Sequence, residues 1–263
     1  MKSKLVLSLY PGLGGLCRGF TRAGFTVAKG PDKLLGERIE DFHGIKGRFD
    51  GVIGGSPCQP YSGLNRTAKR KTEDPGLFNF RRVVSECQPE FWLHENVVGV
   101  PEFQIEGYKA QRFHIDLSSF RDASRLRVFT FGHKGGRLLN PIKSESRAGL
   151  EPCALTTDSR PWDVLRDIQG FEPDLTLNGF TDAGKKRLIA NAVPVPMAEY
   201  VADLIKRDIY GKTPRMTDLL GDPVRRCACG CGRAVYGRSK TYDGACRMRV
   251  CRKRRNNAAK PAL

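Results

Sequence analysis

The sequence predicts an α/β fold built around a mostly parallel sheet. Six short runs with strand character recur along the chain, at residues 4–9, 25–28, 49–54, 91–94, 112–116 and 126–132. Helical or glycine-rich intervals separate these runs, which is the pattern of alternating strands and helices in α/β domains. The chain has 263 residues, of which 40% are hydrophobic. It is therefore long enough for one core of ordinary size and a small appendage.

The first strand is expected to lead into a ligand-binding turn. The apolar residues Leu5–Tyr10 are followed by Pro11–Gly15 and by a helix-like stretch, 16–23. A strand that turns through glycines into a helix lets the backbone approach an adenosyl or nucleotide ligand closely. The glycine spacing matches neither the dinucleotide nor the Walker pattern, so NAD and ATP are not indicated. The alternative is a tight turn without a ligand.

A thiol is expected at the end of the third strand. Residues 49–55 form an apolar stretch that ends in glycines, and Pro57-Cys58-Gln59-Pro60 follows directly. This arrangement displays a cysteine at the carboxyl edge of a sheet, as a nucleophile requires. The alternative is a small cysteine that only packs in the core.

Two later strands carry charged side chains. The run 91–94 delivers Glu95 and Asn96, and alternation places Arg125 and Arg127 on one face of the sixth strand. A cysteine hydrolase would also need a histidine base, and none of the four histidines lies in a context typical of that role. The predicted site thus combines a thiol, a carboxylate and two guanidinium groups. Farther along, residues 196–205 predict an amphipathic helix that packs back onto the sheet.

The charge balance indicates a polyanionic partner. The chain contains 45 Lys and Arg against 28 Asp and Glu, which gives a net charge of +17. Such an excess is typical of phosphate binding, although charge can also serve solubility alone. From Arg225 onward there are 12 basic residues and one acidic residue, so +11 lies in the last 39 residues.

Cysteine usage and the apolar runs, none of which has the length of a signal peptide or a transmembrane helix, predict a cytoplasmic protein. The chain has nine cysteines, an odd number scattered through core and tail, which argues for a reducing compartment. The apolar run near the start is too short for a signal peptide, and no transmembrane run is evident.

The tail is expected to bind zinc. Residues 211–224 have the composition of a linker, and 225–256 then form a small basic module followed by a tail, 257–263. Soft thiolates suit tetrahedral zinc, and a module this small cannot fold on apolar burial alone. The expected ligands are Cys227, Cys229, Cys231 and Cys246, with Cys251 as a substitute. The alternative is a disordered basic tail with incidental cysteines.

Six short motifs occur in order between residues 4 and 207. They are Gly12-Leu13-Gly14-Gly15, Pro57-Cys58-Gln59, Glu95-Asn96-Val97, Arg125-x-Arg127-Val128-Phe129, Ile168-Gln169-Gly170-Phe171 and Asn191-Ala192-Val193-Pro194-Val195-Pro196. In these motifs the chain resembles the DNA cytosine-5 methyltransferases, specifically the compact versions carried by phages and prophages. The resemblance implies a Rossmann-like methyltransferase fold that uses S-adenosylmethionine, acts on double-stranded DNA and works as a monomer. The tail is similar to small treble-clef-like zinc fingers with a basic helix that lies along phosphates.

The resemblance also implies roles for individual residues. Cys58 would attack C6 of a flipped-out cytosine, Glu95 would bond the ring near N3, and Arg125 and Arg127 would hold the base carbonyl and backbone. The cofactor residues would be Tyr10, Gly12, Leu13, Gly14, Pro57, Asn191 and Val193, with Asp32 on the ribose and Asp41 at the adenine. The best register places Arg38 where the adenine aspartate is expected, so that contact is open.

Two segments around the implied site differ from larger relatives. Only residues 133–159 are available for target recognition, too few for a separate recognition domain. The stretch 61–77 after the nucleophile is expected to be a mobile lid over the flipped base, or else a solvated loop.

Two alternative functions are an RNA (tRNA) cytosine-5 methyltransferase and a catalytically inactive DNA-binding protein of the same fold.

Overall fold

The computed structural model describes most of the chain. The described residues are 3–58, 61, 74–142, 149–211, 225–229, 234–235, 246 and 248. They belong to two compact units, residues 1–213 and residues 214–263. The first unit contains a six-stranded sheet with its helices, and the second contains a two-stranded hairpin.

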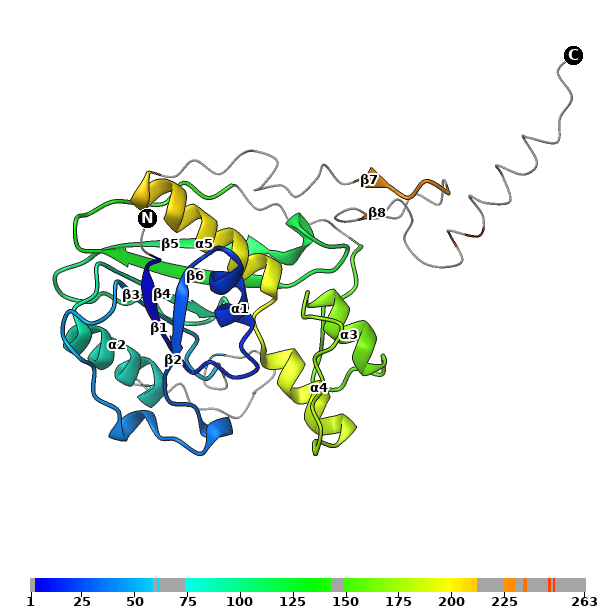
Figure 1. Ribbon diagram of the computed structural model, residues 1–263, viewed down its shortest axis with the longest axis horizontal. Helices are drawn as coiled ribbons and strands as arrows, with labels where there is room; N and C mark the ends of the chain where they lie inside the picture. Colours follow the sequence, from blue (N-terminus) through cyan, green and yellow to red (C-terminus); the bar gives the residue numbers. More distant parts are fainter. Residues whose placement is uncertain are drawn as a thin grey trace, which may run out of the picture. The chain divides into compact units, whose positions relative to one another are not determined.

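All six predicted strands form, and they make one sheet in the order β2-β1-β3-β4-β6-β5 (Figure 1). Their bounds are β1 Leu5–Leu9, β2 Thr26–Lys29, β3 Gly51–Gly54, β4 Phe91–Asn96, β5 Lys109–Asp116 and β6 Leu126–His133. Neighbours from β2 through β4 run parallel, whereas β6 is antiparallel to both β4 and β5. The prediction of a mostly parallel sheet is confirmed.

Helices α1 (Gly15–Arg22) and α5 (Val195–Tyr210) cover one face of the sheet (Figure 1). Residues 16–23 were predicted as a helix-like stretch after the glycine turn, and 196–205 as an amphipathic helix. Their buried side chains share a core with alternate residues of the strands, including Val6 on β1. The two helices touch at Gly19, where a Cβ would lie 2.4 Å from the Cβ of Ala198. Only glycine permits this approach.

Helix α2 (Pro75–Cys87) covers the opposite face. Asp74 caps it by accepting the backbone N–H groups of Gly76 and Leu77 at 3.3 and 3.0 Å, and proline occupies the first helical position, where it is favoured. Residues at helical spacing then pack on the strands: Leu77, Phe80, Val83 and Val84 meet Leu7, Leu9, Val52 and Trp92. The helix therefore starts inside the stretch predicted as a lid, of which residues 62–73 lie outside the described part.

The remaining elements of the first unit are short. Two 3-10 turns, η1 (Lys33–Leu35) and η2 (Ile39–Asp41), follow β2, and η3 (Leu117–Ser119) follows β5. Helices α3 (Trp162–Ile168) and α4 (Asp182–Asn191) precede α5. Within the predicted recognition region, the described residues 134–142 and 149–159 hold no helix or strand element. They contribute one isolated bridge, Ser124 to Pro152.

The stretch Asp182–Tyr210 is long and apolar enough by composition to span a membrane. However, 67% of its most apolar window is buried inside the protein. The apolar character is explained by α5, whose buried face forms part of the core.

The second unit is described in short pieces. Strands β7 (Arg225–Arg226) and β8 (Ala234–Val235) pair antiparallel. Three cysteines of this unit, Cys227, Cys229 and Cys246, are buried together. Most of the predicted linker, 212–224, lies outside the described residues.

Candidate active site

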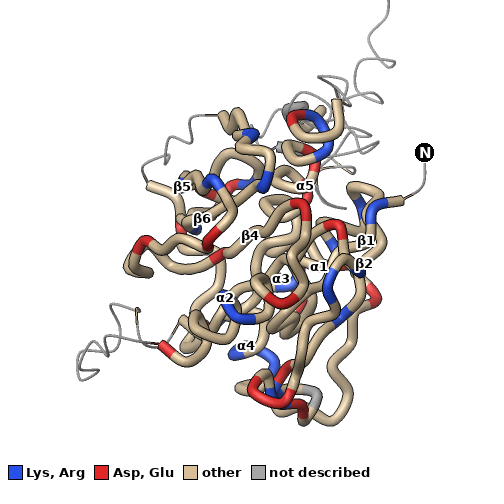
Figure 2. Tube along the Cα trace, turned by 90° about the vertical axis from the view of Figure 1, so that its left-hand side faces the viewer, with Lys and Arg blue, Asp and Glu red and all other residues tan. Residues whose placement is uncertain are grey.

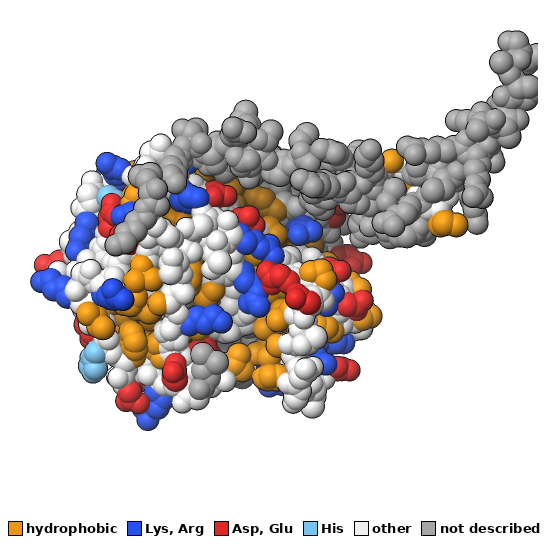
Figure 3. Space-filling view, in the orientation of Figure 1, with side chains coloured by type: hydrophobic (Ala, Val, Ile, Leu, Met, Phe, Trp, Pro, Cys, Tyr) orange, Lys and Arg blue, Asp and Glu red, His pale blue; other side chains and the backbone are white. Residues whose placement is uncertain are grey.

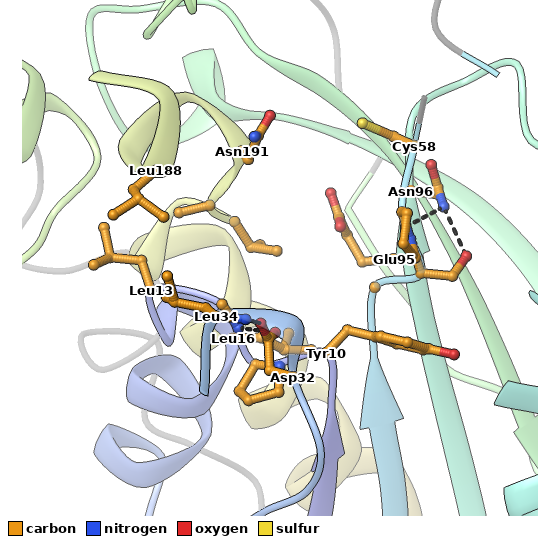
Figure 4. A pocket seen from close by; sticks show the side chains of 18 of the residues that line it. Tyr10, Leu13, Leu16, Asp32, Leu34, Cys58, Glu95, Asn96, Leu188 and Asn191 are labelled. Atoms are coloured by element: carbon orange, nitrogen blue, oxygen red, sulfur yellow. Dashed lines mark hydrogen bonds between the residues drawn. The ribbon is translucent and has the colours of Figure 1, made fainter. Parts of the chain in front are cut away.

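A cavity of about 320 Å³ opens at the carboxyl ends of the parallel strands (Figure 4). This edge is where open α/β sheets bind ligands, and the volume lies within the usual range of ligand pockets, ~300–1,000 Å³. Eleven residues from the sequence analysis line the cavity: Tyr10, Gly12, Leu13, Asp32, Pro57, Cys58, Glu95, Arg125, Arg127, Asn191 and Val193. In Figure 4, Leu13, Leu16 and Leu188 lie on one side and Cys58, Glu95 and Asn96 on the other.

Cys58 is held at the cavity by the segment that follows β3. Every residue of β3 is buried, so the chain emerges from the core directly into this segment. A Cβ on Gly55 would lie 2.9 Å from Oε2 of Glu95, and only glycine lets the segment rest on that carboxyl group. The backbone turns after Cys58, where Tyr61 N–H donates to its carbonyl at 2.9 Å. Gln59 and Pro60 lie outside the described residues.

Glu95 is a buried carboxyl group that faces Arg127. Its exposed fraction is 7%, and Nε of Arg127 lies 3.1 Å from Oε1. Burial raises the pKa of Glu95, and the charges of Arg127 and Arg125 oppose that shift only in part. Among the described residues, the contact with Arg127 engages only one of the two carboxylate oxygens. Glu95 therefore holds a proton more readily than an exposed carboxylate does.

Arg125 joins β6 to the segment that follows α4. Its Nη2 donates to the carbonyls of Ala190 and Ala192, and its Nη1 donates to the carbonyl of Ala154 at 3.3 Å. Its buried Nε has no partner among the described residues. Burial lowers the pKa of Arg125 to about 10, so the group stays charged at neutral pH. Three of the five guanidinium N–H groups thus hold the backbone, and the Nε–H is among the two that remain for a ligand.

Asp32 holds the glycine-rich turn after β1. Its two carboxylate oxygens accept the backbone N–H groups of Gly12 and Leu34, at 2.8 and 2.7 Å. Tyr10 adopts a positive φ of 53°, which is uncommon for a residue other than glycine, and its hydroxyl donates to the carbonyl of Gly76 at 2.8 Å. The turn is thus fixed from both sides before any ligand binds.

The amino end of α1 lies directly against the last motif. Gly14 caps α1 with a φ of 83°, and a Cβ on Gly15 would lie only 1.9 Å from the carbonyl oxygen of Val193. Gln169 holds the chain on both sides of Val193. Its side-chain Nε2 donates to the Ile189 carbonyl at 2.6 Å, and its backbone carbonyl accepts the Val195 N–H at 2.9 Å. These contacts bring the motifs that contain Gly15, Gln169 and Val193 together in space.

Some cavity residues were missed, and two predicted residues lie elsewhere. Leu34, Glu37, Ile39 and Leu188 also line the cavity. Asp41 does not line it; its side chain is 73% exposed and lies 3.7 Å from Arg38. Gly14 acts at the helix cap and is not a lining residue. The segment 37–41 offers three acidic residues without a helical or strand period, so only the folded backbone shows that Glu37 lines the cavity.

A second group of reactive side chains lies in the second unit. The thiol sulfurs of Cys227, Cys229 and Cys246 all lie within 4.8 Å of one another, and the first two are 3.4 Å apart. Converging buried thiols at this separation fit a tetrahedral metal. The other two predicted ligands, Cys231 and Cys251, lie outside the described residues.

Comparison with known proteins connects the first unit to one family. Residues 36–120, which include Cys58 and Glu95, match the sequence model of the family described as C-5 cytosine-specific DNA methylase. The Type II methyltransferase M.FnuDI of Fusobacterium nucleatum is 37% identical over 114 residues, which cover 36% of this chain and 33% of the relative. This chain spans about a third of the length of the first curated relatives it matches.

Solved structures show the same architecture. The methyltransferase EhMeth of Entamoeba histolytica aligns with a TM-score of 0.57 and 14% identity, covering 80% of this chain and 99% of that one. A mutant DNMT2 of Spodoptera frugiperda aligns with a TM-score of 0.56 and 13% identity, covering 77% of this chain and 99% of that one. The first unit therefore has the mixed α/β methyltransferase fold, and its residues 36–120 match the C-5 cytosine-specific DNA methylases.

Proposed function

We propose that this chain is a DNA cytosine-5 methyltransferase that works through a covalent bond between Cys58 and C6 of the target cytosine. The main support for this proposal is one cavity at the carboxyl edge of the sheet, which is lined by Cys58, Glu95, Arg125 and Arg127. The match over residues 36–120 supports the same reaction.

The chemistry follows from what each side chain offers. The Cys58 sulfur adds to C6 while Glu95 gives a proton to N3, so electron density moves to C5. S-adenosylmethionine, when bound, supplies the methyl group that C5 takes and leaves as S-adenosylhomocysteine. Transfer of the C5 proton to water then restores the C5–C6 double bond and breaks the bond between sulfur and C6. This step frees the Cys58 thiolate, and N3 returns its proton to Glu95. The buried position of Glu95 suits it to hold the proton that the ring needs. Arg127 and the free Nε of Arg125 supply positive charge next to the base.

The rest of the cavity fits the cofactor. Leu13, Leu16 and Leu188 form an apolar end, which suits an adenine ring. Asp32 accepts two backbone N–H groups and keeps lone pairs for ribose hydroxyls. Asn191 and Val193 line the same cavity from the end of α4. We assign Tyr10, Gly12, Leu13, Pro57, Asn191 and Val193 to this cofactor site, with Gly14 shaping the helix cap; Glu37 is a better-placed acid than Asp41 for the adenine.

We further propose that the second unit is a zinc module. Cys227, Cys229 and Cys246 would be three of its ligands, and Cys231 would be the fourth. The module carries most of the excess positive charge, so it would bind DNA phosphates largely without regard to sequence. A thiolate site of this kind requires reduced cysteines, which agrees with a cytoplasmic protein. The relatives are named Type II methyltransferases, which supports a role of the chain in restriction and modification.

The test of the proposed function compares wild type with Cys58→Ser on two substrates, duplex DNA and tRNA. Wild type is expected to methylate the duplex, and the serine variant is expected to lose transfer while it still binds DNA. Bisulfite sequencing of DNA from expressing cells gives the target site. Transfer to tRNA alone would favour an RNA substrate, and wild-type activity in Cys58→Ser would contradict the covalent mechanism. DNA binding without any transfer in wild type would identify an inactive binding protein.

A further inference from the structure

A buried hydrogen-bonded cluster lies beneath the nucleophile segment. Ser56, His94 and Asn96 are 4%, 0% and 2% exposed. Ser56 Oγ lies 3.0 Å from Nε2 of His94, and Asn96 Nδ2 donates to the carbonyl and the hydroxyl of Ser56 at 3.0 and 3.3 Å. Ser56 is two residues from Cys58, and His94 and Asn96 flank Glu95 on β4. The cluster thus connects the segment that carries Cys58 with the strand that carries Glu95.

The directions of these hydrogen bonds are fixed by their donors. Val97 N–H can only donate, and it meets Oδ1 of Asn96 at 2.8 Å, so the amide nitrogen of Asn96 faces Ser56. The Ser56 hydroxyl accepts from that nitrogen and still has its own proton to give, with Nε2 of His94 at 3.0 Å. The backbone N–H of Ser56 points to the same nitrogen at 3.5 Å. Nε2 is therefore the acceptor, and the imidazole proton is on Nδ1.

The buried imidazole of His94 is expected to destabilise the fold at this position. The rings of Phe80 and Phe103 lie 4.9 and 5.2 Å from its ring, and its buried Nδ1 has no partner among the described residues. Burial lowers the pKa of His94 to about 3, so the ring is neutral and keeps Nε2 as an acceptor at neutral pH. An apolar side chain would fit these surroundings better, since a buried polar atom without a partner is destabilising. A role beyond packing would explain the histidine.

We propose that His94 is a positioning residue: by accepting a hydrogen bond from the Ser56 hydroxyl, it orients Cys58 relative to Glu95. This inference rests on the proposed covalent role of Cys58. The histidine does not touch the base. It fixes the rotation of Ser56, and Asn96 fixes the carbonyl of the same residue. Pro57 is the only residue between that fixed point and Cys58, so the thiol inherits its direction.

The test uses variants that separate positioning from packing. His94→Met and Ser56→Ala each remove the bond, His94→Gln keeps an acceptor near the position of Nε2, and the double variant removes both polar groups. Thr130→Val is the matched control, because Thr130 pairs with His94 across β4 and β6 and its buried hydroxyl has no partner among the described residues. The readouts are the rate of covalent trapping by DNA carrying 5-fluorocytosine, the affinity for S-adenosylmethionine, the alkylation rate of Cys58 by iodoacetamide and the midpoint of thermal unfolding.

His94→Met, Ser56→Ala and the double variant are expected to trap DNA about 10-fold to 100-fold more slowly, as misplacement of a reacting group does. The double variant should be no slower than either single variant. Cofactor affinity should stay unchanged, Cys58 should be alkylated faster in the freed segment, and His94→Gln should recover most of the trapping rate. The double variant should unfold near the wild-type midpoint, because both polar partners are removed together.

Trapping at the wild-type rate in Ser56→Ala or His94→Met would overturn the proposal, as would equal losses in Thr130→Val. A slow His94→Gln that unfolds like wild type would also contradict it. If wild type itself fails to trap DNA, the covalent function fails instead. The alkylation rates then still decide whether His94 sets Cys58.

Discussion

At the scale of single residues, Glu95 and its neighbours define what the site can do. Burial raises its pKa while Arg127 approaches one oxygen at 3.1 Å. A carboxyl group in this position can hold a proton in one step and stabilise positive charge in another. Asp32, an acid that lines the cavity near the turn after β1, already accepts two backbone N–H groups. Glu95 is therefore suited to proton transfer, and Asp32 to holding the turn and binding a ligand.

Glu95→Gln should lower the rate of methyl transfer by about 10²- to 10⁴-fold, the usual contribution of a positioned acid. The amide keeps the size of the side chain but cannot deliver a proton to N3. Glu40→Gln is the control, since Glu40 does not line the cavity and pairs with Arg38 at 3.8 Å. Single-turnover methylation of duplex DNA measures both. Equal rates in Glu95→Gln and wild type would remove Glu95 from the mechanism.

His94 should make the protein less stable in mild acid. Its pKa in the folded protein is about 3, below the ordinary 6.5, because of burial and the nearby charge of Arg112. The unfolded chain therefore binds a proton first as the pH falls, and the free energy of unfolding decreases between pH 6.5 and about 3. Above that window the contribution is complete.

Urea unfolding at pH 7.5 and pH 5 measures this effect. The loss of unfolding free energy between the two conditions should be smaller in His94→Gln than in wild type, by up to about 2 kcal/mol. Thr130→Val should lose as much as wild type. An identical loss in His94→Gln would show that other groups set the acid sensitivity.

At the scale of elements, the approach of α1 to the last motif is the most constrained contact. Gly15→Ala would place a methyl group 1.9 Å from the Val193 carbonyl, so α1 and residues 191–193 must separate. Overpacking of this kind costs about 1–3 kcal/mol, and it widens the cofactor side of the cavity. We expect lower stability together with weaker binding of S-adenosylmethionine, measured by calorimetry.

Gly184→Ala provides the matched control. Gly184 lies within α4, and the nearest atom to an added Cβ is the Thr181 hydroxyl at 3.3 Å. In a helix this change is expected to stabilise by about 0.4–1 kcal/mol. Weaker cofactor binding in Gly184→Ala but not in Gly15→Ala would contradict the assignment of the close contact.

The sequence predicted those elements whose signal is local. Each strand is a short apolar run bounded by turns, and α1 and α5 carry apolar residues at helical spacing. Helix α2 was missed because it begins within a polar stretch that suggested a loop, and its cap at Asp74 is visible only once the backbone is placed. The antiparallel pairing of β6 also went unpredicted, since strand direction is set by the connections and not by composition.

The same distinction applies to the candidate site. Cys58, Glu95, Arg125 and Arg127 follow strands, so their positions at one sheet edge could be expected. Glu37 faces the cavity from an irregular segment, and no period in the sequence distinguishes it from Asp41. The acceptor role of His94 depends on Ser56, 38 residues away, and separation of that size leaves no local pattern.

At the scale of the whole molecule, charge is divided unevenly between the two units. Residues from Arg225 onward carry +11 of the net +17. On the described part of the first unit, basic and acidic residues are interspersed (Figure 2), and the face in Figure 3 shows both signs mixed with apolar side chains. Nonspecific affinity for DNA should therefore depend mainly on the second unit.

Deleting residues 222–263 should leave a folded, cofactor-binding enzyme with weaker DNA affinity. For every phosphate that the shortened chain no longer neutralises, the slope of log affinity against log salt becomes shallower by about 0.9. Binding measured at several salt concentrations gives this slope, and cofactor affinity shows that the first unit is intact. An unchanged slope would mean that the first unit binds the phosphates.

Cys246→Ser in the full-length chain should reproduce the deletion if zinc orders the second unit. Losing one thiolate from a four-ligand site removes much of the free energy that folds such a module. Zinc content per chain and the salt slope are measured together, with Cys153→Ser as the control because Cys153 is a buried cysteine of the first unit. Zinc-free wild-type protein would contradict the metal site.

The contact between Gly15 and Val193 also bears on the order of events during synthesis. The turn after β1 leaves the ribosome well before residues 188–193, which make the wall it lies against. Until those residues emerge, a nascent chain has Cys58 and Glu95 but only part of the cavity wall. Under the proposed function, methyl transfer therefore requires that α4 has been made, and S-adenosylmethionine would stabilise only chains that already contain it.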